Sequence, residues 1–258
     1  MVATAPTYTI SWEKLPDDFV LPDDPVDNIN QPALAAALTE SLQLAGHLPD
    51  MAFTSTNYGM CATVNGKFVV KAPDWAYVRQ ISVPRSEVER SYTPRLQGEV
   101  PTMVLEFLSE SEGGEYSVKA TYPPGKFFFY EQVLHVPNYG IFEPKSGTLE
   151  LYRFDDAGRY TLQSVNEQRR FWIPEMQLFL GGWQGGRENR NGYWLRWWDA
   201  EDNLLLWGFE QAERDRQTIA QERQHAEQER QRAEQERQRA ERLAAKLRAA
   251  GLDPEQID

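Results

Sequence analysis

The sequence predicts an α+β fold in which a mixed β-sheet is flanked by helices and followed by a long C-terminal α-helix. Over residues 30–208, short apolar segments bounded by Pro, Gly and Asn turns alternate with two stretches of helical periodicity. From residue 212 the chain consists mostly of Ala, Glu, Gln and Arg, which are strong helix formers. We therefore expect a globular domain over 1–208, a charged heptad-like helical tail over 209–250 and a short end over 251–258.

Length and composition limit the class of protein. A chain of 258 residues with 41% hydrophobic residues suits one domain of about 200 residues plus an appendage. It has no run of about 18 or more apolar residues, so no membrane span is expected. The N-terminal residues lack the basic and apolar regions of a signal peptide. A single cysteine, Cys61, excludes an internal disulfide and a cysteine-based zinc site. These observations favour a cytoplasmic protein.

The charge of the chain argues against non-specific binding of nucleic acid. The net charge is -12; residues 209–258 hold 10 Lys/Arg and 12 Asp/Glu, which leaves 17 and 27 for residues 1–208. The globular part therefore carries about -10, whereas proteins that bind DNA non-specifically are usually basic. A nucleic-acid-binding function would need a local basic groove.

The first half of the chain predicts an extended lead-in, one helix and several short strands. Residues 1–30 are rich in Pro and Asp. A helix begins near Asn30 and ends at Gly46, with Leu34, Leu38 and Leu42 on one stripe. The expected strands are 52–56, 61–64, 67–71 and 75–78, with Asn65-Gly66 as a hairpin turn between the second and third.

The second half predicts a central strand, a helix and further strands. Residues 79–100 form a long surface connection. Residues 101–109 contain few polar positions and are expected to lie in the middle of the sheet, covered on both faces. A helix over about 125–135 follows the turn at 122–125. Further strands are expected at 139–143, 148–154 and 160–165.

Aromatic residues are concentrated near the end of the globular part. Residues 171–208 contain six of the eight Trp, and 193–209 are expected to form a hairpin around 200–203. Such a cluster can stack on nucleobases. A small secondary core is the interpretation we favour.

The tail repeats AEQERQR at 226–232 and 233–239. Its heptad seam holds Ala, Ile or Leu at one position, but the position three residues later is acidic until Leu243. A stable coiled coil needs apolar residues at both positions. A single solvated helix is therefore expected, with a weak or heteromeric coiled coil as the alternative.

Three charged residues stand where an apolar protein core would exclude them. Glu106 lies in the middle of the strand 101–109, and a lone buried carboxylate is costly unless it is paired or bound to metal. Lys126 lies on the apolar stripe of the following helix and in its first turn, where the helix dipole disfavours a cation. Asp74 opens the strand 75–78. Two carboxylates can hold Mg²⁺ and assist phosphodiester hydrolysis. The structural alternatives are a turn residue for Asp74 and a lysine that reaches solvent for Lys126.

The residues around these positions resemble a known family. The segments are APDW at Asp74, VLEFLS at Glu106, KFFFYE from Lys126 and PNYGIFEP from Pro137. Together they resemble the Uma-two family of restriction endonucleases, a branch of the PD-(D/E)XK nuclease superfamily, over about residues 10–208. The resemblance implies a restriction-endonuclease-like core and a DNA-cleaving site that depends on Mg²⁺ or Mn²⁺. It assigns Asp74 and Glu106 to the metal and Lys126 to catalysis.

The sequence departs from the superfamily pattern at two positions. The usual lysine two residues after the acid is replaced by Leu108, which leaves Lys126 as its replacement. No acid follows Glu115 before that lysine, so Glu115 and Glu40 are the candidates for a third carboxylate. Lys119 is a candidate substitute or substrate contact.

Two functions remain open on these observations. The first is a metal-dependent endonuclease acting on DNA. The second is a catalytically inactive nuclease-fold protein that binds or assembles through its C-terminal helix. Restriction-type folds often act as dimers, so a homodimer and association through the tail are the expected forms of self-association.

Overall fold

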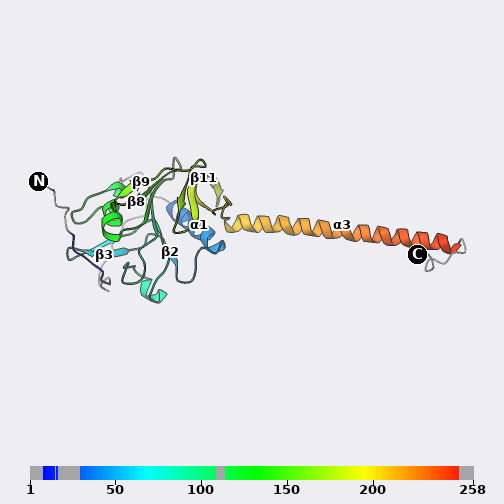
Figure 1. The fold of residues 1–258 in the computed structure, drawn as a ribbon, viewed down its shortest axis with the longest axis horizontal. Coiled ribbons are helices and arrows are strands. Elements are labelled where there is room, and N and C mark those ends of the chain that lie inside the picture. The colour runs from blue at the N-terminus through cyan, green and yellow to red at the C-terminus, as the bar shows by residue number, and fades with distance from the viewer. Residues whose placement is uncertain (1–7, 15, 17–29, 109–113, 250–258) are drawn as a thin grey trace. The chain divides into compact units, whose positions relative to one another are not determined.

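The fold is described by a computed structural model for residues 8–14, 16, 30–108 and 114–249. Most of the predicted lead-in over 1–30, and the end over 251–258, lie outside these described residues. The chain divides into two compact units, Met1–Trp207 and Gly208–Asp258, which we call the body and the tail (Figure 1). Each is described by itself.

A six-stranded mixed sheet forms the centre of the body and confirms the predicted fold class. Its order is β2-β5-β6-β7-β8-β9, and only β6 and β7 run parallel. The strands are β2 (Phe53–Ser55), β5 (Trp75–Val78), β6 (Met103–Phe107), β7 (Asn138–Glu143), β8 (Thr148–Phe154) and β9 (Tyr160–Leu162). The prediction placed β6 in the interior, and all five of its residues are buried.

Two three-stranded sheets complete the β-structure. One pairs β1 (Ile10–Ser11), β3 (Met60–Val64) and β4 (Lys67–Lys71). Asn65 and Gly66 both have positive φ, as a tight hairpin turn requires. The other pairs β10 (Arg170–Ile173), β11 (Leu178–Arg187) and β12 (Arg190–Trp198).

The predicted hairpin over 193–209 is present only in part: the chain reverses around 200–203, but the second arm pairs with β12 through a single antiparallel bridge. The long hairpin is β11–β12, and it turns at Glu188 and Asn189, which both have positive φ. After β12 a turn leads only to a single bridge between Trp198 and Leu204, and the tail helix begins at Gly208. Tryptophans lie on both strands of the β11–β12 hairpin and on the segment after it, so their positions do not show where the chain reverses.

The helices of the body differ in their regularity. They are α1 (Asn30–Leu44), the 3₁₀ turns η1 (Arg85–Val88) and η2 (Gly114–Tyr116), and α2 (Lys126–Phe128), which continues as the π-helix η3 (Phe129–Leu134). The predicted helix over 125–135 is therefore present, but most of it is wider than an α-helix. His135 ends it in the left-handed conformation.

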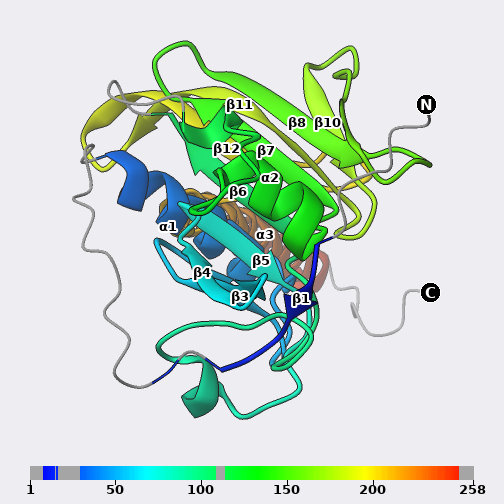
Figure 2. The same cartoon turned by 90° about the vertical axis from the view of Figure 1, so that its left-hand side faces the viewer.

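The core has two parts, one on each face of the central strand. Met103, Leu105 and Phe107 belong to the cluster that contains α1 and the β10–β12 sheet, whereas Val104 joins the cluster of β3, β4 and η3. Figure 2 shows α1 and α2 beside the central strands. This two-sided burial follows from the alternation of side chains along a strand.

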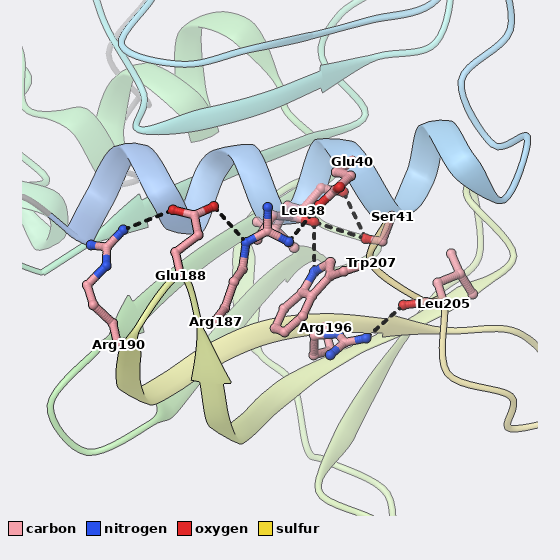
Figure 3. Close-up of polar contacts among 10 residues, drawn as sticks. Leu38, Glu40, Ser41, Arg187, Glu188, Arg190, Arg196, Leu205 and Trp207 are labelled. Atoms are coloured by element: carbon pink, nitrogen blue, oxygen red, sulfur yellow. Dashed lines mark hydrogen bonds and ion pairs between the residues drawn. The ribbon is translucent and has the colours of Figure 1, made fainter. Parts of the chain in front are cut away.

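The tryptophan cluster is part of the main core and not a secondary one. Trp207 donates a hydrogen bond to the Ala37 carbonyl of α1 at 3.1 Å. The fully buried Arg196 lies 3.5 Å over the Trp207 ring, and its guanidinium donates to the Leu205 carbonyl (Figure 3). These contacts attach the β11–β12 hairpin to α1.

The tail is one long helix, α3 (Gly208–Ala249), as predicted. Over its described length none of its residues is buried, and Ile219 and Leu243 of the seam are exposed. Side chains four residues apart pair along it, for example Arg237 with Glu241. Within the part of the chain that the structure describes, no helix is long and apolar enough to cross a membrane.

Candidate active site

Two carboxylates meet where β5 begins and β6 ends. The antiparallel register pairs Trp75 with Leu105, so Asp74 and Glu106 fall next to each other on neighbouring strands. The Asp74 carboxylate accepts a hydrogen bond from the Phe107 backbone N–H at 2.5 Å. Asp74 is therefore held toward Glu106 by the backbone of the strand that carries Glu106.

The helix after the loop supplies two donors to Glu106. The Lys126 ammonium lies 2.9 Å from Glu106 Oε2, and the Tyr130 hydroxyl donates to Glu106 Oε1 at 2.9 Å. The two donors are four residues apart, so they project from the same face of the helix. The Glu106 side chain is 0% exposed, whereas that of Lys126 is 28% exposed. The ammonium contacts a buried acid rather than lying free in solvent.

A third carboxylate, that of Glu115, approaches from η2. Its Oε1 lies 3.6 Å from the Lys126 ammonium. The Tyr139 hydroxyl donates to the Glu115 backbone carbonyl at 2.9 Å and fixes this turn over β7. Glu115 Oε2 is buried and accepts no hydrogen bond from the residues that the structure describes.

The loop between Glu115 and Lys126 depends on Gly125. A Cβ at this position would lie 2.1 Å from the Ser117 carbonyl oxygen. The same carbonyl accepts a hydrogen bond from Phe128 N–H, and Gly125 N–H donates to the Lys119 carbonyl. This close approach brings Glu115 and Lys126 to the same side of the sheet.

Burial sets the protonation of the acids. It raises the pKa of Glu106 to about 8, with a contribution from Asp74, against the opposing effects of Lys126 and Tyr130. Burial also raises the pKa of Asp74, although the Phe107 N–H and Lys126 lower it. Burial by itself would lower the pKa of Lys126, but the carboxylates of Glu106, Asp74 and Glu115 raise it, so the ammonium stays charged.

The tyrosine beside the acids remains a hydrogen-bond donor. Burial raises the pKa of Tyr130 well above its usual value, and the charge of Glu106 adds to the effect. Tyr139 behaves in the same way for the same reasons. Neither hydroxyl ionises near neutral pH, so the Tyr130 O–H stays available to Glu106.

These residues fit a hydrated divalent cation better than a closed metal cage. Among the described residues, no group of three or more His, Cys, Asp or Glu has the arrangement of a metal site. Mg²⁺ keeps several waters and is often held by one or two carboxylates. Asp74 and Glu106 are the residues that could hold such an ion, and Glu115 Oε2 is a further buried acceptor beside Lys126.

The remaining predicted residues lie apart from this group. Glu40 on α1 bonds to Arg187 of β11 at 2.6 Å, in a chain of ion pairs that continues through Glu188 to Arg190 (Figure 3). Glu40 thus joins the hairpin to α1, and of the two candidates for a third carboxylate only Glu115 contacts Lys126. Lys119 is exposed in the loop, and its backbone carbonyl accepts the Gly125 N–H.

Sequence reasoning gave no role to Tyr130 or to Gln31. Tyr130 follows Lys126 by four residues on the same face of the helix, and that spacing was the available signal. Gln31 donates to the Phe107 carbonyl at 2.9 Å from α1, and no local pattern in the sequence marks that contact.

The comparison with protein families decides the relationship. A family model for Uma2, described as "Putative restriction endonuclease", matches residues 16–185, about two thirds of the chain. The chain belongs to the Uma2 family. The matched region contains Asp74, Glu106, Glu115, Lys126 and Tyr130, so the whole residue group lies inside it. It ends within β11, so β12 and the tail lie beyond the family match. A search of curated proteins found no match.

Proposed function

We propose that this Uma2 protein is a divalent-metal-dependent endonuclease that hydrolyses phosphodiester bonds in DNA, and that residues 1–208 form its nuclease domain. The observation that carries the proposal is the contact of the Lys126 ammonium with the fully buried Glu106, beside Asp74. A half-buried cation and two adjoining buried acids have little net value for stability, because burying such a pair costs about as much as it returns. Two acids that can hold a metal ion and an adjoining cation are the groups that a phosphoryl-transfer site uses.

Each residue has a separate role in the proposed reaction. Asp74 and Glu106 would hold Mg²⁺ or Mn²⁺, which when bound would supply an activated water and neutralise charge on the phosphate. Lys126 orients the attacking water or stabilises the charge that develops on the phosphoryl oxygens. The β5–β6 register and the Phe107 N–H keep the two acids in place without a change of structure.

The loop that leads to Lys126 offers contacts for the substrate strand. Residues 118–123 are all exposed, and they include Lys119 and Tyr122. The Lys67 ammonium lies 4.8 Å over the Tyr122 ring. Lysines contact phosphates and exposed aromatic rings stack on bases. This short basic and aromatic segment is the kind of local surface that an acidic body would need to bind DNA.

The alternative is a catalytically inactive nuclease-fold protein that binds partners through its tail. One observation favours it: none of the 42 described residues of α3 is buried, and the apolar Ile219 and Leu243 are exposed. A polar helix of this kind is also stable by itself when it carries many pairs of opposite charge four residues apart.

The test uses the full-length protein and supercoiled plasmid DNA with Mg²⁺ or Mn²⁺. We expect nicking or linearisation by the wild type and a loss of at least about 100-fold in Asp74→Ala and Glu106→Ala. Asp156→Ala, in an exposed turn, is the matched control for removal of a carboxylate. Absence of cleavage by the wild type, together with absence of metal binding by calorimetry, would overturn the enzyme proposal. Cleavage of RNA but not of DNA would show that the substrate is RNA.

A further inference from the structure

Lys126 and Tyr130 each bind a different carboxylate oxygen of Glu106. The ammonium is bound to Oε2 and the hydroxyl to Oε1, each at 2.9 Å. Both donors come from one helix, and the carboxylate is fully buried. A metal ion that binds Glu106 must therefore displace one of these donors or share an oxygen with it.

The two donors differ in their freedom to move. The Tyr130 side chain is fully buried, and its ring lies 5.1 Å from the Tyr139 ring and 5.9 Å from that of Phe129. Its hydroxyl cannot withdraw without disturbing the core. The Lys126 side chain is flexible and 28% exposed, and its ammonium already lies 3.6 Å from Glu115. Lys126 can leave Glu106 and keep an ionic partner.

Asp74 bears on the same exchange. It lies beside Glu106 across the β5–β6 register, where the Phe107 N–H holds its carboxylate, and the Lys126 ammonium lies 2.9 Å from Glu106 Oε2. A divalent cation held by these two acids would lie beside Glu106 as well. Two cations this close in a buried site repel each other strongly.

We infer that a divalent cation and the Lys126 ammonium exchange at Glu106 Oε2, while Tyr130 remains on Oε1 as a positioning residue. This inference rests on the proposed function. Before loading, the Lys126 ammonium is bound to Glu106 Oε2. On loading, the ammonium moves toward Glu115 and is freed for the substrate phosphate, so that metal binding and the release of Lys126 are one event.

The exchange predicts opposite effects from two residues on the same helix. Lys126→Met removes the competing cation, so at a pH at which Glu106 is ionised the affinity for Mn²⁺ should rise by about tenfold or more. Tyr130→Phe removes only the hydroxyl that orients Glu106, so the affinity should fall by about 10- to 100-fold. Lys126→Arg keeps the competing charge and should bind Mn²⁺ no more tightly than the wild type.

The experiment is titration of the full-length protein with Mn²⁺ by isothermal calorimetry, without DNA. Lys14→Met controls for loss of an exposed positive charge, and Tyr160→Phe controls for loss of a tyrosine hydroxyl that donates a hydrogen bond to the Val136 carbonyl. Both controls should stay within about twofold of the wild type. Circular dichroism melts of all the variants show whether each one is folded under the titration conditions.

The outcomes separate this inference from the proposed function. If the wild type binds Mn²⁺ and Asp74→Asn does not, but Lys126→Met binds no more tightly than the wild type, the exchange is wrong and the metal site stands. If Tyr130→Phe binds like Tyr160→Phe, the positioning role is wrong. If the wild type and Lys126→Met both fail to bind Mn²⁺, the exchange and the metal-dependent function fall together.

Discussion

The contact between Lys126 and Glu106 can be measured as stability, without reference to activity. Lys126→Met removes the charge and retains most of the apolar stem. Removing one partner of a buried ion pair costs about 3–5 kcal/mol. The lower end applies here, because Lys126 is 28% exposed and is partly screened by solvent, and because Tyr130 still donates to Glu106. We expect a loss of about 3 kcal/mol in the free energy of unfolding at about pH 9.

The loss in the free energy of unfolding caused by Lys126→Met should be larger at high pH than at low pH. The pKa of Glu106 is raised to about 8 by burial, and removing Lys126 removes an effect that lowers it. A carboxyl whose folded pKa is raised keeps its proton in the folded state. Its stabilising contribution is therefore complete below the unfolded pKa and is lost as pH rises through the folded value. At about pH 5 Glu106 is neutral in both proteins, so the loss should shrink to about 1 kcal/mol or less.

The assay is urea denaturation followed by tryptophan fluorescence. All eight tryptophans lie at or before Trp207, so the signal reports on the body. Glu106→Gln and the double variant complete a mutant cycle, and the coupling energy near pH 9 should be about 2–3 kcal/mol. Equal losses at both pH values, or purely additive single variants, would refute the ion pair as the origin of the effect.

Three further outcomes are expected. The affinity for Mn²⁺, measured by calorimetry, should rise by up to about tenfold per pH unit below about 8 and then level off, because the metal competes with the raised proton affinity of Glu106; a flat profile would contradict this. Gly125→Ala should lower the free energy of unfolding by about 1–3 kcal/mol in the same urea assay, because its Cβ would meet the Ser117 carbonyl at 2.1 Å; an unchanged midpoint would show that the loop adapts. Glu115→Gln should weaken Mn²⁺ binding while Glu40→Gln does not, since Glu40 is held by Arg187; a larger effect at Glu40 would reverse this assignment.

Most of the strands could be predicted from the sequence, because hydrophobic alternation and turn residues are local signals. The observed spans of β4, β5 and β8 equal the predicted ones. β6 is buried on both faces, as its apolar composition indicated. The β11–β12 hairpin was missed because glycines and tryptophans along both strands do not mark a register. The π-helical geometry of η3 also has no simple local signal.

What the sequence alone determined was the set of residues that are costly to bury: Glu106 in an apolar strand and Lys126 on an apolar helical stripe. The segments around the same residues carried the resemblance to the family, and the family model matches residues 16–185. Only the tertiary structure decided their partners. The strand register set Asp74 beside Glu106, the loop at Gly125 delivered Glu115 to Lys126, and the helix directed Tyr130 to the second oxygen of Glu106. Local patterns predict which side chains are buried, but contacts between segments far apart in the chain depend on how those segments pack together.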